Sequence, residues 1–230
     1  MWQIRAARPG SRLTDMNCCD SNGLDKMFAG PLVREELRAY RASGLSKRQR
    51  KLVTLVGHLP PGASVLDIGC GIGAVGTALL ARGAGEGHFI DVSSAYLAAA
   101  REVAADAGVG ERAAFYRDDF AVSEHPYPQA DVVVLDRVVC CYPDASALLA
   151  KAARHCRGTL VFTYPRAFGF ARLFGALCAL LMRFSGREYR FFVHDPATLM
   201  RAATVAGPAR VVVRSAGVWQ LVKVSKTRSA

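Results

Sequence analysis

The chain has 230 residues, of which 51% are hydrophobic and 21% charged, a balance that is typical of a globular protein and excludes a mainly disordered one. Its formal net charge is +11, but the basic residues are scattered, so we interpret them as a solvated surface; affinity for an acidic ligand, anionic lipid or nucleic acid is the alternative. Seven cysteines without a CxxC pair argue against a zinc ribbon and predict no metal site. Residues 1–12 lack the apolar core of a secretory signal, so we expect reduced thiols and a cytoplasmic protein.

The N-terminal quarter indicates an arm followed by two helices. Residues 1–17 mix polar residues with Pro and Gly and predict a loose arm. A first helix is expected from Pro31 until Gly44, and a second, which Ser46 can cap, over 47–59. We therefore expect residues 1–59 to form an arm and a helical lid.

Alternating strand and helix patterns follow, and they predict a parallel, three-layer α/β sheet. A first strand runs into Ile68, and later strands are expected over 88–92, 113–117, 131–136 and 159–164, with helices over 74–81, 95–107 and 145–156. The apolar run at 131–136 is of the kind that is buried on both faces.

The C-terminal third adds an insert and a hairpin. Residues 168–184 are apolar on nearly all sides but too short and interrupted for a confident membrane span, so we expect a buried or interfacial helix in an insert at about 166–192. Asp195 and Pro196 mark another helix start, and strands over 209–215 and 218–224 predict a hairpin at the sheet edge. Residues 60–230 would then form one domain.

The glycine loop after the first strand is the main functional signal. Gly69, Gly71 and Gly73 occupy every second position, after Asp67. Glycine lets a ligand approach the backbone, and the N–H groups of the helix that follows attract polar or anionic ligand groups. A nucleotide-like ligand is therefore expected at the carboxyl end of this strand.

Two cofactors compete for this loop. The segment from Gly69 to Ala74 satisfies a loose G-x-G-x-x-A, and Asp91 lies at an acceptable spacing for a ribose-binding acid, so a dinucleotide is one reading. However, Asp67 would repel a pyrophosphate, whereas the ammonium and sulfonium of S-adenosylmethionine tolerate an acid there. An acidic pair, Asp118-Asp119, also follows the third strand, where an adenine amino group could be met.

In these segments the chain resembles the class I S-adenosylmethionine-dependent methyltransferases. The residues that carry the resemblance are Val65 to Gly73, Asp91 with Val92-Ser93, Asp119-Phe120 and Ala130 to Asp136. The resemblance implies a Rossmann-like fold whose mostly parallel seven-stranded sheet has an antiparallel last strand, with S-adenosyl-L-methionine as the cofactor.

The resemblance also implies residue roles. Gly69, Gly71 and Gly73 would form the floor under the methionine part, with Asp67 at its ammonium. Asp91, beside Val92, would take the ribose hydroxyls; Asp119 of the pair Asp118-Asp119 would meet adenine N6; and Phe120 could flank the ring. Asp136 and Arg137 would lie beside the transferred methyl group. Any one of these acids alone could equally cap a helix, but three after consecutive strands favour a shared ligand.

The acceptor is less constrained. No N/D-P-P-Y/F motif follows the fourth strand, which makes a nucleic-acid base unlikely as acceptor, and the layout is similar to magnesium-protoporphyrin methyltransferases. The chain departs from the D-x-x-x-H-Y pattern of that group, because Cys140-Cys141-Tyr142 stands there with no histidine. We regard Asp136, Tyr142 and His194 as the catalytic candidates, although a loop histidine without a catalytic task and a pocket-wall tyrosine are the plainer readings.

These observations predict a methyltransferase for a small or medium apolar acceptor, most simply at oxygen. Arginines around the apolar insert would suit an acceptor with a carboxylate, and contact with a membrane surface is a further option. The alternatives are an RNA or protein methyltransferase, a catalytically inactive binding module and, more distantly, a dehydrogenase. The oligomeric state is left open.

Overall fold

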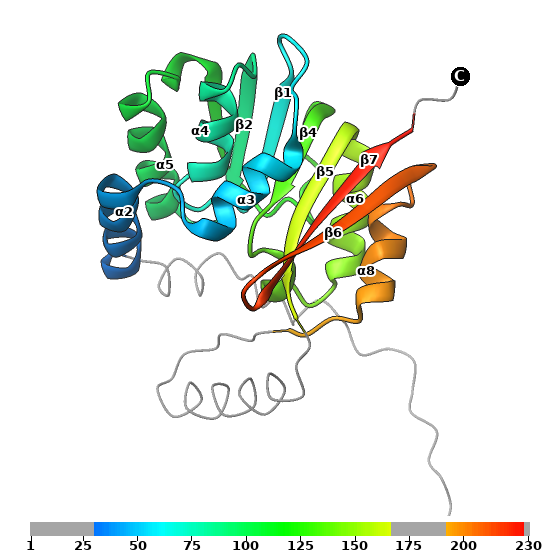
Figure 1. Ribbon diagram of the computed structural model, residues 1–230. Coiled ribbons are helices and arrows are strands. Elements are labelled where there is room, and N and C mark those ends of the chain that lie inside the picture. The colour runs from blue at the N-terminus through cyan, green and yellow to red at the C-terminus, as the bar shows by residue number, and fades with distance from the viewer. Residues whose placement is uncertain (1–29, 167–191, 228–230) are drawn as a thin grey trace, which may run out of the picture.

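The computed structural model describes residues 30–166 and 192–227, which form a seven-stranded sheet with helices on both faces (Figure 1). The strand order is β3-β2-β1-β4-β5-β7-β6. Only β7 runs antiparallel to its neighbours, β5 and β6, while β1 to β5 pair in parallel. The predicted fold class, with its antiparallel last strand, is confirmed.

The strands are β1 (Ser64–Ile68), β2 (Glu86–Asp91), β3 (Ala113–Arg117), β4 (Ala130–Leu135), β5 (Cys156–Pro165), β6 (Ala209–Ala216) and β7 (Trp219–Lys226). The helices are α2 (Pro31–Ser43), α3 (Lys47–Val56), α4 (Ala74–Ala81), α5 (Ser94–Asp106), α6 (Ala145–His155) and α8 (Pro196–Ala203), with 3-10 turns η2 (Gly110–Arg112) and η3 (Val139–Cys141).

The two faces of the sheet follow from the period-two alternation of its central strands. In β1, Val65 points into a cluster with α3 and α4, whereas Leu66 and Ile68 point into a second cluster with α6 and α8. Asp67 lies on the same face as Val65, toward α4. One acid in an otherwise buried strand is thereby aimed at the start of the helix that follows it.

Several predicted boundaries agree with the structure, and others shift by a few residues. The helix over 74–81 and the strand over 113–117 have the predicted bounds. The second helix ends at Val56, before the predicted residue 59, because Gly57 adopts φ 85°. The fifth strand begins at Cys156, since it continues directly from α6.

Helices α2 and α3 lie in different places relative to the sheet. Leu52, Val53 and Val56 of α3 are buried in the core over one face, so α3 belongs to the helical layer there. Val33 of α2 packs instead with residues of α5 and with Ile72 of the glycine loop. The domain division at residue 59 stays a prediction.

Some predictions fall outside the described residues. These are the arm at 1–17, with Cys18-Cys19 beyond it, and the apolar helix over 168–184 with the arginines around it. Within residues 30–166 and 192–227, no helix has the length and apolar character needed to cross a bilayer.

Candidate cofactor and acceptor site

The glycine loop between β1 and α4 adopts backbone angles that favour glycine. Gly69, Gly71 and Gly73 have φ values of 63°, 55° and 70°, in the left-handed region that side chains rarely occupy. At Gly69 space is also limiting, since a Cβ there would lie 2.5 Å from Cγ2 of Val138. Gly73 caps α4, so the loop delivers the N–H groups of that helix to one edge of the sheet.

Asp91, at the end of β2, holds this loop. One carboxylate oxygen accepts a hydrogen bond from the N–H of Gly71 at 2.8 Å, and the other accepts from the N–H of Ser93 at 2.9 Å. The Cys70 N–H also donates to the Ile90 carbonyl at 3.0 Å. Asp91, the residue predicted to bind the ribose, therefore contacts the glycine loop that is predicted to lie under the methionine part, at the carboxyl ends of β1 and β2.

Asp67 is a buried acid beside the same loop. Its side chain accepts a hydrogen bond from the N–H of Gly76 at 3.0 Å. Burial, together with the negative charges of Asp136 and Asp91, raises the pKa of Asp67 to about 7, although the Gly76 hydrogen bond opposes this. A cation placed beside Asp67 would relieve the cost of ionising it, as the ammonium of S-adenosylmethionine would.

The acidic pair after β3 separates into two roles. Asp118 accepts hydrogen bonds from the hydroxyls of Ser123 and Tyr127; burial alone would raise its pKa, but these bonds outweigh it and lower the pKa. Asp118 therefore closes the turn after β3. Asp119 accepts from the N–H of Ala121 at 3.0 Å, and burial raises its pKa, which leaves Asp119 as the adenine candidate of the pair.

The environments of Phe120 and Val92 do not support their predicted contacts with the cofactor. Phe120 is only 3% exposed and packs in the core against Tyr127 and His155, so it does not present a ring face to a ligand as predicted. Val92 is half-buried, and its carbonyl accepts from Nε of Arg117 at 3.2 Å. The core position of Phe120 follows from its place in the cluster under α6.

Asp136, which follows β4, is engaged by an arginine from α3. Nε and Nη2 of Arg48 donate to its two oxygens at 2.9 and 2.8 Å, a bidentate ion pair whose side chains are 15% and 10% exposed. The buried hydroxyl of Thr163 donates to Asp136 at 2.9 Å and accepts from the N–H of Arg137 at 2.7 Å. Asp136 is therefore a paired carboxylate, and its place beside the transferred methyl group stays a prediction.

A second arginine pair ties α2 to the site. Glu36 of α2 accepts from Nη2 of Arg137 at 2.8 Å and from the hydroxyl of Tyr96 at 3.0 Å. Tyr96 faces Gly71, because a Cβ on that glycine would lie 3.8 Å from its ring. Arg137 also has φ 65°, and no other non-glycine residue of the described chain has a positive φ.

The two remaining catalytic candidates are close to each other. Nε2 of His194 lies 3.0 Å from the carbonyl oxygen of Tyr142, and the N–H of Phe192 donates to the Cys140 carbonyl at 2.8 Å. A carbonyl only accepts, so Nε2 carries the hydrogen. The segment before α8 thus contacts the turn after β4, while the catalytic roles of Tyr142 and His194 stay predictions.

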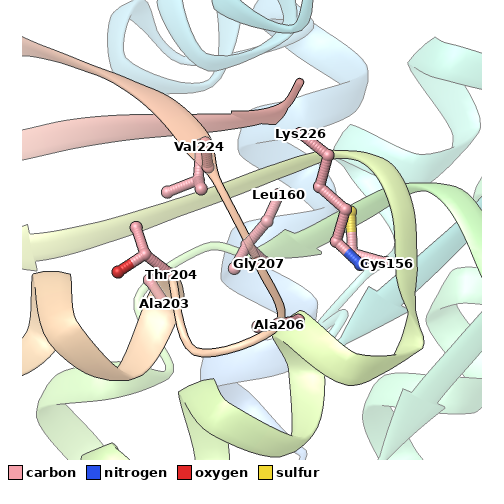
Figure 2. Close-up of a pocket in the computed structure, with 10 residues that line it drawn as sticks. Cys156, Leu160, Ala203, Thr204, Ala206, Gly207, Val224 and Lys226 are labelled. Carbon is pink, nitrogen blue, oxygen red and sulfur yellow. The ribbon is translucent and has the colours of Figure 1, made fainter. Parts of the chain in front are cut away.

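A small pocket lies away from all of these residues. Cys156, Leu160, Thr204, Val224 and Lys226 surround it, where α6, β5, α8 and the hairpin meet (Figure 2). It lies at the start of β5, whereas Asp67, Asp91 and Asp136 lie at or after the carboxyl ends of their strands. The small pocket is therefore separate from the glycine loop.

Sequence reasoning missed Arg48 and Glu36, which supply the long-range contacts of the site. Both occur in charged, amphipathic helices where neighbouring residues look the same, so no local signal separates them. The sequence does contain one relevant signal, the capping box that Ser46 and Gln49 form. It fixes where α3 begins and so places Arg48 in the first turn of that helix.

Comparison with known proteins agrees with this geometry. A family model described as "Methyltransferase domain" matches residues 65–158, which contain the loop and the acids after β2, β3 and β4. A search of curated protein sequences gave no match.

Solved structures with the same fold cover most of the chain at low sequence identity. Magnesium protoporphyrin IX methyltransferase from Synechocystis PCC 6803, with bound SAH, is 20% identical over 90% of this chain and 100% of its own, with a TM-score of 0.67. An O-methyltransferase family protein from Burkholderia thailandensis is 18% identical over 89% of this chain and 63% of its own, with a TM-score of 0.67.

An O-methyltransferase family 2 protein from Planctomyces limnophilus DSM 3776, in complex with apigenin, is 20% identical over 85% of this chain and 62% of its own, with a TM-score of 0.63. At these identities the likeness shows the fold, and the family match shows the domain. Residues 65–158 thus belong to the methyltransferase domain family, and the chain that carries them has the fold of S-adenosylmethionine-dependent methyltransferases.

Proposed function

We propose that this enzyme transfers the methyl group to an oxygen atom of a small or medium apolar acceptor. The observation that carries the cofactor assignment is the pair of hydrogen bonds from Gly71 and Ser93 to Asp91, which joins the ribose acid to the glycine floor. Support for an oxygen acceptor comes from the O-methyltransferases of the same fold.

The described residues fit the cofactor part by part. Gly69, Gly71 and Gly73 leave the loop backbone open to the methionine part, and Asp67 offers its ammonium a buried negative charge. Each oxygen of Asp91 can accept a hydrogen bond from a ribose hydroxyl in addition to the one from its backbone N–H donor. Asp119 is the acid left to meet the adenine amino group. Bound there, the cofactor supplies the electrophilic methyl group.

The protein's main task in this reaction is to position the acceptor oxygen in line with that methyl group and to exclude water. Asp136 is held by Arg48 and Thr163, so in this arrangement its oxygens are engaged by donors of the protein. A neutral His194 that donates through Nε2 would carry its lone pair on Nδ1, which is the atom that could act as a base. An acceptor that is already ionised, such as a carboxylate, needs no base.

The first test concerns the cofactor. Asp91→Ala should weaken binding of S-adenosylhomocysteine by at least about 30-fold, or about 2 kcal/mol, in calorimetry, because the two ribose hydroxyls and the N–H groups of Gly71 and Ser93 lose their acceptor. Asp118→Ala is the matched control, since that acid is assigned to the turn, and its affinity should stay within about threefold. Equal affinities in the Asp91 variant and the wild type would remove the ribose assignment.

The second test concerns the acceptor. Protein incubated with a small-molecule extract and methyl-labelled cofactor should label a compound that mass spectrometry identifies as an O-methyl product. Labelling of RNA or protein with steep loss on adding salt would instead favour the polyanion alternative, which the +11 charge motivates. Cofactor binding with no labelled product from any fraction would favour an inactive binding module.

An acceptor carboxylate, a cytoplasmic location and contact with a membrane surface belong to the same proposal. The arginines that motivate the carboxylate lie mostly in and around the insert, at 172, 183, 187 and 190, with Arg166 at the end of the described segment. Partition of the enzyme between buffer and anionic vesicles would test the membrane part.

A further inference from the structure

The turn after β4 holds two adjacent cysteines that the proposed reaction does not use. Sγ of Cys140 and Sγ of Cys141 lie 3.7 Å apart, far beyond the ~2.05 Å of a disulfide bond. Both thiols approach the carbonyl oxygen of Arg137, at 3.5 and 3.3 Å. The two sulfurs therefore point to the same side of the turn.

The backbone sets this spacing. The N–H of Cys141 donates to the Val138 carbonyl at 2.9 Å, which closes η3, and the Cys140 carbonyl accepts from Phe192 at 2.8 Å. Cys140 is 2% exposed, whereas Cys141 is half-buried. Cys141 is thus the more exposed residue of the two, and Cys140 is the one enclosed by the core.

We propose that Cys140 and Cys141 form a two-sulfur site for a trivalent arsenic or antimony compound that carries one carbon substituent. Thiolate is the ligand that soft centres prefer. With bonds of about 2.3 Å, as zinc makes to sulfur, two sulfurs 3.7 Å apart subtend an angle of about 107° at the central atom. A pyramidal or tetrahedral centre therefore bridges them with little movement.

Two sulfur donors suit a monosubstituted trivalent arsenic or antimony compound better than they suit a bound metal ion. A structural zinc site needs four ligands, and the described residues contain no cluster of three or more His, Cys, Asp or Glu side chains that could hold a metal. A monosubstituted trivalent arsenical has one bond to carbon and two positions for sulfur. Its valence is completed by the two thiols alone.

The reaction balances without an oxidant. Phenylarsine oxide reacts with two thiols to form two As–S bonds, while both S–H bonds and the arsenic–oxygen bond break and one water molecule leaves. Arsenic stays trivalent throughout. The hydrogen bond between the two thiols, together with burial, raises the pKa of Cys140, which is compatible with a reaction that starts from neutral thiols.

The test uses phenylarsine oxide and the full-length chain with Cys18→Ser and Cys19→Ser, because that other adjacent pair could bind the same probe. Intact-mass spectrometry should show one phenylarsenic group per chain, retained in excess monothiol and removed by a dithiol. Cys141→Ser and, separately, Cys140→Ser in this parent should weaken binding at least 100-fold. Cys156→Ser, which alters a buried cysteine of the small pocket (Figure 2), should leave binding unchanged.

Binding of S-adenosylhomocysteine shows that each variant is folded, and it is independent of the arsenical result. Absence of an adduct on the folded parent, or equal binding by the parent and the folded Cys141→Ser variant, overturns the site. If Cys140→Ser does not fold, the half-buried Cys141 decides the question by itself. None of these outcomes depends on whether an acceptor is found.

Discussion

At the scale of single residues, the site depends on carboxylates whose surroundings differ. Asp91 is held by two backbone N–H groups, Asp136 by a bidentate arginine, and Asp67 by a single N–H in a buried place. These partners decide which acid has spare capacity for a ligand. Asp67 would gain most from a bound cation, because burial raises its pKa and the negative charges of Asp136 and Asp91 raise it further.

We predict that cofactor affinity depends on pH through Asp67. The pKa of Asp67 is raised to about 7 in the folded chain. The free energy of unfolding of the ligand-free chain is therefore highest below the usual pKa of an aspartate and falls as pH rises from there to about 7. An ammonium favours the ionised form, so affinity for S-adenosylhomocysteine should fall by up to about tenfold per unit as pH drops from 7 to 5. Calorimetry across this range checks the slope, and Asp67→Asn should flatten it. A wild-type affinity that is constant over the range would contradict the assignment.

We also predict that Gly69→Ala destabilises the fold by about 2–4 kcal/mol, since the new Cβ would meet Val138 at 2.5 Å while the backbone keeps a φ of 63°. Urea unfolding measures the loss. Gly83→Ala is the control, because φ there is 105° but a Cβ meets nothing within 4 Å. Adding Val138→Ala to Gly69→Ala should recover the steric part, and no recovery would show that backbone strain accounts for the whole effect.

At the scale of elements, α3 does more than cover the sheet. The Ser46 capping box starts it, three apolar residues fasten it to the core, and this places Arg48 at the carboxyl end of β4, with its guanidinium 5.6 Å from the ring centroid of Trp219. The helix was predictable from its cap and apolar spacing. The partner of Arg48 was not, because Asp136 lies 88 positions further along the chain.

Arg48→Ala should lower the free energy of unfolding by about 3–5 kcal/mol, because it leaves the carboxylate of Asp136 buried without its partner. Denaturant unfolding measures this loss. Arg50→Ala, on the exposed side of the same helix, should change stability by less than about 1 kcal/mol. Asp136→Asn in the Arg48→Ala background should restore part of the loss, and an equal loss from both arginine variants would refute a specific role for the pair.

At the scale of the whole molecule, the sheet brings three loops to one edge while α2 and α3 supply charges from the N-terminal side. Glu36 contacts Tyr96 of α5 and Arg137 after β4, so it spans the cofactor loop and the acceptor side. A ligand between these elements should stabilise the folded chain as a unit.

We therefore predict that S-adenosylhomocysteine at about 100 times its Kd raises Tm by about 5 to 10 °C, which corresponds to about 2.7 kcal/mol of binding linkage in a chain of this size. Thermal denaturation with and without the ligand measures the shift. At the same ligand concentration, Asp91→Ala should show a much smaller shift, and an unchanged wild-type Tm would contradict binding to the native state.

The sequence by itself determined the strand and helix alternation, the glycine loop, the acid that ends β2 and the acid that follows β4, because backbone conformation and burial alternate over a few residues and leave a local pattern. It named His194 and Tyr142 as separate catalytic candidates, and their contact came only from the structure. The tertiary structure alone decided that Asp118 turns toward Tyr127, that Phe120 enters the core, and that Arg48 and Glu36 reach the site. The contacts of Arg48 and Glu36 join residues far apart in the chain, and the energies of all these contacts depend on how whole elements pack, which no short stretch of sequence encodes.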